Sequence, residues 1–182
     1  MENKILIIGG TGLVGKKIIE MLRNDVPQYP IYIGSRKENL SDNTFLKIDV
    51  QEPQSLEIIV QEGISLVVLC ASDPADNVLK YCIAQKIDYI DITKPTSELK
   101  AAYSLAKSQH IQSQIVFSSG WMGGIVSSMA YALQSEFEAV TLFISYSLND
   151  LAGESTTHFI AENVTKNFNK YEDDKPISTN IF

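Results

Sequence analysis

The stretch KILIIGGTGLVGKK, close to the start of the chain, is the feature that most limits what this sequence can fold into. Four aliphatic residues, Ile5 to Ile8, form the continuous apolar run of a buried strand. A glycine cluster follows directly, and an amphipathic helical pattern begins near Leu13. A strand that passes into a helix through glycines is typical of the first βα unit in a doubly wound α/β sheet.

Strand-like and helix-length segments alternate along most of the chain. The expected strands are 4–9, 30–35, 45–50, 66–72, 88–93, 114–119 and 140–148. The expected helices are 13–24, 53–62, 76–85, 97–109 and 124–135. Asp76 is a capping signal for the third of these helices. Several strands are continuous and β-branched, as parallel strands are when helices cover both faces. The sequence therefore predicts a doubly wound parallel sheet of the Rossmann type, with right-handed crossovers.

The character of the sequence changes after about residue 135. The segment 140–148 alternates between apolar and polar residues, which suits a half-solvated antiparallel strand. The final stretch, NKYEDDKPISTNIF, is polar and has no closing hydrophobic pattern. We therefore expect a nucleotide-binding domain over residues 1–135. The start of a small or truncated α+β segment, for substrate binding or oligomerisation, is expected over residues 136–182.

Charge and hydropathy exclude several classes of function. The formal net charge of −7 argues against nucleic acid as a partner, because such binding rests on Lys and Arg neutralising phosphates. No apolar run approaches the roughly 20 residues of a membrane helix, and the N-terminus lacks a signal-peptide pattern. Cys70 and Cys82 lie in apolar patterns without metal-ligand spacing, so we expect two buried thiols and no metal. These features predict a cytoplasmic protein that does not bind membranes.

The glycine cluster matches the dinucleotide fingerprint G-x-G-x-x-G in its proper context, between a strand and a helix. Its six positions are Gly10, Thr11, Gly12, Leu13, Val14 and Gly15. The first glycine permits a tight turn, the second lets a pyrophosphate approach the backbone, and the third lets helix and strand pack closely. The helix N-terminus adds free N–H groups and a partial positive charge. A purely structural glycine turn is the alternative.

The residues that end the second expected strand indicate which dinucleotide is bound. NAD-binding domains usually place Asp or Glu there, whereas NADP-binding domains offer Arg to the 2′-phosphate. This chain has Ser35 and Arg36, and its first acid is Glu38. A guanidinium–phosphate contact is charge-assisted and can be bidentate. We therefore expect NADP as the cofactor, with NAD as the alternative; solvated loop charges are the simpler explanation of this segment.

Two further strand ends are predicted to contact the cofactor. Asp49 and Val50 end the third strand, where an adenine-facing contact commonly lies. Ala71 and Ser72 follow the fourth strand, at the carboxyl edge where open α/β sheets bind ligands. Small residues there would let the ribose and nicotinamide side pass close to the backbone. An ordinary strand-to-helix loop is the alternative.

Several of these segments together resemble the saccharopine dehydrogenase-like family, in its N-terminal NAD(P)-binding domain. The resemblance covers roughly residues 3–135 and rests on GGTGLVG, GSR, IDV, VVLCASDP and LKYCIAQKIDYIDIT. The segment SSGWMGGIVSSMA is similar to a later glycine-rich turn of the family, which implies that Gly120, Trp121 and Met122 lie near the nicotinamide. The family usually has Pro before the final glycine of this turn, where this chain has Gly123.

The resemblance implies NADP-dependent oxidoreductase chemistry, with hydride transfer to or from a small amino, imino or carbonyl substrate. In the family a second domain holds the substrate, and few residues remain for it after Ser135. The chain is then either truncated or completed by another subunit, as in a homodimer. The alternative function is an NmrA-like regulator that binds NAD(P) and senses its redox state without catalysis.

No catalytic acid or base stands out in the sequence. Tyr103 and Lys107 have the Y-x-x-x-K spacing of short-chain dehydrogenases, but they precede the strand that the motif should follow, so we expect a pair on a helix surface. Lys94 follows the fifth strand, where it could meet a substrate carboxylate or lie as an exposed loop lysine.

Overall fold

The computed structural model describes residues 3–37, 44–118, 124–133, 135–137, 168–172 and 175–179. The chain divides into two compact units, Met1–Ser145 and Tyr146–Phe182.

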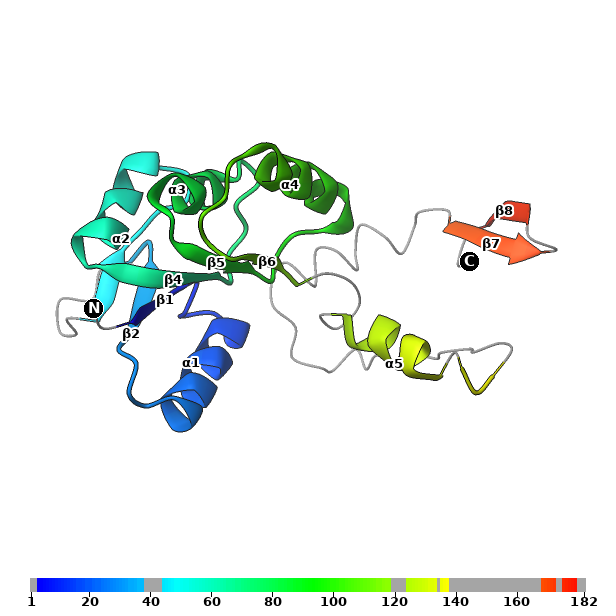
Figure 1. Ribbon diagram of the computed structural model, residues 1–182, viewed down its shortest axis with the longest axis horizontal. Coiled ribbons are helices and arrows are strands. Elements are labelled where there is room, and N and C mark those ends of the chain that lie inside the picture. The colour runs from blue at the N-terminus through cyan, green and yellow to red at the C-terminus, as the bar shows by residue number, and fades with distance from the viewer. Residues whose placement is uncertain are drawn as a thin grey trace. The chain divides into compact units, whose positions relative to one another are not determined.

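The first unit is built on one sheet of six parallel strands (Figure 1). They are β1 (Lys4–Ile8), β2 (Ile31–Ser35), β3 (Phe45–Lys47), β4 (Ile64–Leu69), β5 (Asp88–Asp91) and β6 (Ile115–Phe117). Their order across the sheet is β3-β2-β1-β4-β5-β6. The chain thus runs outward from β1 to β3, crosses back to the other side of β1, and runs outward again to β6. This order confirms the predicted doubly wound, Rossmann-type sheet.

Helices connect these strands. They are α1 (Leu13–Asp25), the 3₁₀ helix η1 (Pro53–Leu56), α2 (Glu57–Gln61), α3 (Asn77–Gln85), α4 (Thr96–Ser108) and α5 (Ile125–Leu133). The helix expected over 53–62 is therefore split, with a 3₁₀ turn that has Pro at its start and a short α-helix after it. None of the described helices is long and apolar enough to cross a membrane.

The continuous apolar runs arise because the central strands are covered on both faces. In β1, Leu6 and Ile8 belong to one core cluster, which includes residues of η1, α2, α3 and α4. Ile5 and Ile7 point to the opposite face and pack with Ile19 of α1. Figure 1 shows α1 on one side of the sheet and α2, α3 and α4 on the other.

In the second unit the described residues form one antiparallel pair, β7 (Phe168–Glu172) and β8 (Lys175–Thr179). Phe168 pairs with Thr179 at one end of the register. The sequence indicated no closing pattern here, and the strands were missed because backbone pairing does not require the apolar alternation by which strands are recognised. The strand expected over 140–148 lies outside the described residues.

Candidate functional site

The carboxyl ends of β1, β2 and β4 meet at one edge of the sheet. The Gly9 N–H donates to the Gly34 carbonyl at 3.0 Å, which joins the ends of β1 and β2. The Cys70 N–H donates to the Ile8 carbonyl at 2.8 Å, which joins the ends of β4 and β1. The crossovers run in opposite directions from β1 and β4, so this edge is the switch point where open α/β sheets bind ligands. The structure therefore brings the glycine fingerprint, the Ser35–Arg36 segment and the Ala71–Ser72 segment to the same edge.

The tight turn after β1 is made by Gly9, one residue before the fingerprint. Gly9 has a φ of 83°, in the left-handed region that favours glycine. Its carbonyl accepts the Gly12 N–H at 3.0 Å. A side chain at Gly15 would place its Cβ 2.4 Å from this same carbonyl oxygen. The sequence analysis assigned the turn to Gly10, whereas the structure assigns it to Gly9 and confirms close helix–strand packing at Gly15.

The other two fingerprint glycines differ in their surroundings. A Cβ at Gly10 would lie 2.9 Å from both Ile19 and Ile33, so Gly10 lets α1 pack against β2. A Cβ at Gly12 would meet only the Gly9 carbonyl oxygen within 4 Å, at 3.2 Å, among the described atoms. The backbone at Gly12 is therefore open on its outer side, as a cradle for a phosphate group requires.

The first turn of α1 suits an anion. Gly12 is its N-cap and makes no side-chain cap, and the turn contains no acidic residue. The first N–H groups of a helix have no intrahelical partner and carry partial positive charge. Thr11 is exposed, and Leu13 and Val14 are about half exposed at 52% and 53%, so this end of the helix is accessible. The residues present fit a pyrophosphate.

The end of β2 carries exposed cations beside this bend. Arg36 and Lys37 are both exposed, and Ser35 is half-buried. The Ser35 hydroxyl oxygen accepts the Lys37 N–H at 3.2 Å, while the Ser35 carbonyl accepts the Ile48 N–H at 2.9 Å. These bonds fix the backbone on either side of Arg36.

The loop after β3 is held by its own polar groups. One carboxylate oxygen of Asp49 accepts the Gln51 N–H at 3.0 Å. The Ser55 hydroxyl donates to the Asp49 carbonyl at 2.7 Å. The Val50 carbonyl accepts the side-chain amide of Asn77, the first residue of α3, at 2.8 Å. The half-buried Asp49–Val50 segment thus lies beside the start of α3.

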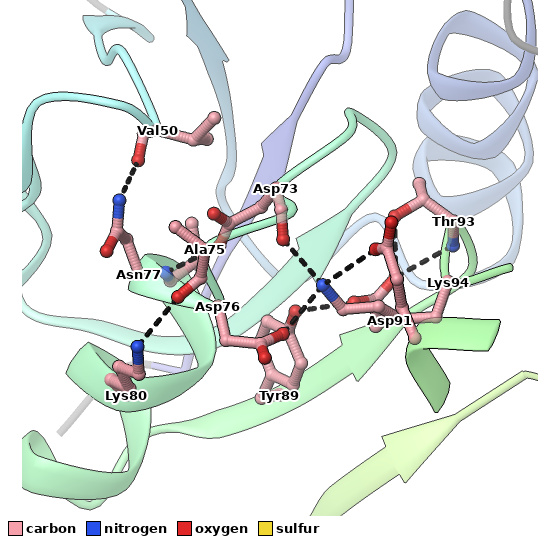
Figure 2. A network of polar contacts seen from close by, with 12 residues as sticks. Val50, Asp73, Ala75, Asp76, Asn77, Lys80, Tyr89, Asp91, Thr93 and Lys94 are labelled. Atoms are coloured by element: carbon pink, nitrogen blue, oxygen red, sulfur yellow. Dashed lines mark hydrogen bonds and ion pairs between the residues drawn. The ribbon is translucent and has the colours of Figure 1, made fainter. Parts of the chain in front are cut away.

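A network of buried charges joins the ends of β4 and β5 (Figure 2). The Lys94 ammonium donates to the Asp73 carbonyl at 2.5 Å and pairs with the Asp76 carboxylate at 2.6 Å. The side chain of Lys94 is only 2% exposed. The expectation of an exposed loop lysine is therefore wrong, because the ammonium of Lys94 is enclosed by groups of its own chain.

A buried carboxylate, Asp91, lies next to this network at the end of β5. One of its oxygens accepts the Tyr89 hydroxyl at 2.8 Å, and the other accepts the N–H and hydroxyl of Thr93 at 2.7 and 2.8 Å. Burial raises the pKa of Tyr89 well above its usual value, and the charge of Asp91 raises it further. Tyr89 therefore stays protonated at neutral pH as a donor to Asp91.

Sequence reasoning missed this network, although one signal was present. Because side chains alternate along a strand, the pattern DYID places Asp91 on the same buried face as Tyr89, and a buried carboxylate needs donors. The capping prediction was also wrong in detail. Asp76 occupies the N-cap position of α3 but makes no side-chain cap. The carboxylate of Asp73 accepts the Val78 N–H at 2.8 Å instead.

The remaining predicted residues divide between those described and those not described. Gly120, Trp121 and Met122 lie outside the described residues. Gly124, directly before α5, has a φ of 87°, which favours glycine. Tyr103 and Lys107 are both exposed on α4, which precedes β6, so the helix-surface prediction is confirmed.

Both cysteines are free thiols; Cys82 is buried, as predicted, whereas Cys70 is only half-buried. Burial, with the nearby charge of Asp91, raises the pKa of Cys70 to about 11. Burial raises the pKa of Cys82 to about 12. Both therefore stay neutral at neutral pH. The described part of the chain contains no group of His, Cys, Asp and Glu residues that could hold a metal ion.

The sequence matches the family model described as the saccharopine dehydrogenase NADP-binding domain over residues 5–120. The chain belongs to this family. NADP is therefore the cofactor of its domain, and the resemblance predicted from the glycine, GSR and YIDIT segments is confirmed. A comparison with curated proteins finds no match.

Solved structures of low sequence identity have the same fold. A dTDP-glucose 4,6-dehydratase from Bacillus anthracis, in complex with NAD, is 15% identical with a TM-score of 0.50, covering 65% of this chain and 55% of that one. A monomeric L-threonine 3-dehydrogenase from a metagenome is 15% identical with a TM-score of 0.50, covering 71% and 61%. An L-threonine dehydrogenase from Phytophthora infestans is 17% identical with a TM-score of 0.50, covering 74% and 62%. The chain thus spans less than two thirds of the length of each.

Proposed function

We propose that this domain binds NADP along the carboxyl edge of its sheet and serves an NAD(P)-dependent oxidoreductase. The substrate is a small amino, imino or carbonyl compound. The observation that carries the proposal is the open, acid-free start of α1, which lies beside the exposed Arg36 at the switch point of the sheet. The family match supports the cofactor, and the resemblance to saccharopine dehydrogenases supports the reaction class.

Each segment of the edge has a role in this proposal. Residues 10–15 hold the pyrophosphate, mainly through the N–H groups of the first turn of α1. Ser35 and Arg36 bind the 2′-phosphate, and Asp49 and Val50 border the adenine. Ala71 and Ser72 lie against the nicotinamide ribose, and residues 120–122 lie near the ring. The nicotinamide supplies or accepts a hydride, and the chain binds and orients it.

The partner in this proposal is a second copy of the chain. In the proposed homodimer, the second copy contributes to the substrate pocket. Sedimentation equilibrium tests this, and a monomer that turns over substrate would contradict it. We place the protein in the cytoplasm, where free thiols such as Cys70 and Cys82 stay reduced.

A regulator without catalysis is a second candidate, and one observation favours it. The titratable residues of the network at the ends of β4 and β5, among them Asp73, Asp91 and Lys94, are buried and bonded to neighbours. None of these three is placed to exchange a proton with a bound substrate. Incubation with NADPH and a panel of imino and keto acids separates the candidates. Only the enzyme would oxidise NADPH, which is followed as a fall in absorbance at 340 nm.

The test of the cofactor site compares NADPH and NADH. We expect NADPH to bind more tightly, and Arg36→Ala to reduce this preference by about tenfold or more, since hydrogen bonds to charged groups contribute about 1.5–3 kcal/mol. Lys107→Ala is the matched control, because it removes an exposed positive charge from α4. Isothermal titration calorimetry gives both affinities. Equal affinities in the unsubstituted protein would contradict the proposal.

A further inference from the structure

The loop between β4 and α3, residues 70–76, contains the two small residues that the proposed function places against the nicotinamide ribose. We call this segment the β4 loop. Ser72 is exposed and Ala71 half-buried, whereas Asp73, immediately after them, is 2% exposed. Asp73 is thus a buried anchor between the exposed Ser72 and the exposed residues 74 and 75.

The anchor is held from two sides. On the α3 side, the Asp73 carboxylate accepts the Val78 N–H at 2.8 Å. On the β5 side, the Asp73 carbonyl accepts a hydrogen bond from the Lys94 ammonium. The same carbonyl accepts the Asp76 N–H, from within the loop, at 3.2 Å. The carbonyl therefore has two donors, and the backbone at Asp73 has little freedom to move.

Lys94 reaches two points of the same loop. Besides the Asp73 carbonyl, its ammonium contacts the Asp76 carboxylate, whose side chain is 17% exposed. A third acid, Glu98 on α4, lies 3.8 Å away. Replacing a buried ion pair by apolar residues is often neutral or stabilising, so such a pair is weak evidence for a role in stability. Its geometric effect is to fasten the β4 loop to the end of β5.

The residue before Lys94 makes a parallel contact. The Thr93 hydroxyl lies 3.3 Å from the Ala71 carbonyl and 2.8 Å from Asp91, which Tyr89 holds in turn. Two consecutive residues after β5 thus contact the β4 loop at Ala71 and at Asp73, on either side of the exposed Ser72. Figure 2 shows Thr93 and Lys94 leaving the end of β5 beside Asp91, with the loop opposite.

We propose that Lys94 is a positioning residue for the nicotinamide half of NADP. It fastens the β4 loop in the conformation that presents Ala71 and Ser72 to the nicotinamide ribose, and it does not touch the cofactor. The adenosine half is bound at the glycine bend and at Arg36, neither of which depends on Lys94. The inference rests on the proposed function.

The test compares two ligands that share the adenosine 2′-phosphate. NADP⁺ carries the nicotinamide ribose, whereas 2′,5′-ADP lacks it. In Lys94→Met, which keeps the length and apolar stem of the side chain, NADP⁺ affinity should fall about tenfold or more. Affinity for 2′,5′-ADP should change less than about twofold, within the spread expected for independent sites. A general loss of structure would instead lower the affinity for both ligands together.

Two further variants separate positioning from folding. Lys80→Met is the matched control, because the Lys80 ammonium donates to the Ala75 carbonyl of the same loop at 2.8 Å but from an exposed position. It should leave both affinities unchanged. Lys94→Met combined with Asp76→Asn removes the unpaired carboxylate, and Asn tolerates the φ of 56° found at this position. The double variant should regain thermal stability without regaining NADP⁺ affinity.

Each outcome has a definite meaning. An equal loss for both ligands in a folded Lys94 variant, or unchanged NADP⁺ affinity, overturns the positioning role while the proposed function stands. Recovery of NADP⁺ affinity together with stability in the double variant also overturns it, because the role would then be structural. If the unsubstituted protein binds neither ligand, the proposed function and this inference fail together.

Discussion

The two halves of the carboxyl edge are built by different physical means. The first, which we call the glycine half, comprises residues 9–15 and the end of β2. It uses backbone turns, close contacts that exclude a Cβ, and exposed cations. The second, the charged half, comprises the β4 loop and residues 91–94, and it uses buried ionic and hydroxyl groups. One half is specified by which side chains are absent, and the other by which side chains meet.

This difference determines which substitutions each half of the edge tolerates. In the glycine bend the contacts run between backbone atoms a few residues apart, such as the Gly12 N–H and the Gly9 carbonyl, and the Gly9–Gly34 bond joins the bend to the neighbouring strand. In the charged half they join residues far apart in sequence, with a sequence separation of 21 for the Lys94–Asp73 bond and 22 for Thr93–Ala71. The first half should therefore be sensitive to added volume and the second to lost partners.

The largest effect is expected from a methyl group added to the glycine half. Gly15→Ala places a Cβ 2.4 Å from the Gly9 carbonyl, and neither backbone segment can retreat easily. We expect the free energy of unfolding to fall by about 3 kcal/mol, at the upper end of overpacking costs, and NADPH binding to be lost. Urea unfolding and calorimetry measure the two effects.

Gly12→Ala sharpens this result. Among the described atoms within 4 Å, its Cβ would meet only the Gly9 carbonyl oxygen, at 3.2 Å. The variant should therefore cost less than about 1 kcal/mol of stability while still filling the phosphate cradle. NADPH affinity should fall in both glycine variants, and stability in only one. Tight NADPH binding by Gly12→Ala would argue that the pyrophosphate lies elsewhere.

A smaller effect is expected when the charged half loses a partner. Tyr89→Phe removes the hydroxyl that donates to the fully buried Asp91. A hydrogen bond to a charged group contributes about 1.5–3 kcal/mol, so the free energy of unfolding should fall by about 2 kcal/mol. Tyr103→Phe, exposed on α4, is the control and should be neutral. If Tyr89→Phe were equally neutral, Asp91 would not depend on this donor.

The smallest effect concerns pH and the core beneath the charged half. Cys82 on α3 belongs to the same cluster as Tyr89, and burial raises its pKa from 9.0 to about 12. As pH rises, the Cys82 thiol ionises at a lower pH in the unfolded chain than in the folded protein. The contribution of the neutral thiol to the free energy of unfolding is therefore fully present below pH 9 and is lost as the pH rises towards 12. At pH 10 the loss is on the order of 1 kcal/mol.

Urea unfolding at pH 7.5 and pH 10, with a reducing agent present, measures this loss. Cys82→Ala should lower stability at both values because of the cavity, but with a smaller difference between them. An unchanged difference would assign the pH dependence to other groups, among them the half-buried Cys70, whose pKa is raised in the same direction.

The sequence predicted the glycine bend well because the contacts among Gly9, Gly12 and Gly15 are local. The spacing of Gly10, Gly12 and Gly15 between an apolar run and a helical pattern predicted the bend, and the strand alternation predicted the sheet. Gly9 was missed because the fingerprint is counted from the next residue. Its role follows from a φ of 83°, which a pattern of residue types does not reveal.

The charged half could not be predicted to the same extent. Because Lys and Asp are exposed in most proteins, the sequence pattern favours a loop role for Lys94 and a capping role for Asp76. Their pairing depends on β5 lying beside β4, a neighbour relation that only the assembled sheet supplies. The polar β7–β8 pair was missed for a related reason, because its pairing uses backbone groups that every residue has.

The pairing of β1 with β4 at the centre of the sheet has a consequence for the order of folding. The Ser65 hydroxyl bonds the Lys4 carbonyl across 61 residues, and the Lys4 ammonium bonds the Glu62 carbonyl across 58. Long-range contacts form late because a large loop must close first. Because chains are synthesised from the N-terminus, the βαβ unit of β1, α1 and β2 can assemble the glycine bend before β4 is made. The motif that marks the family therefore exists before the strand that completes its binding edge arrives.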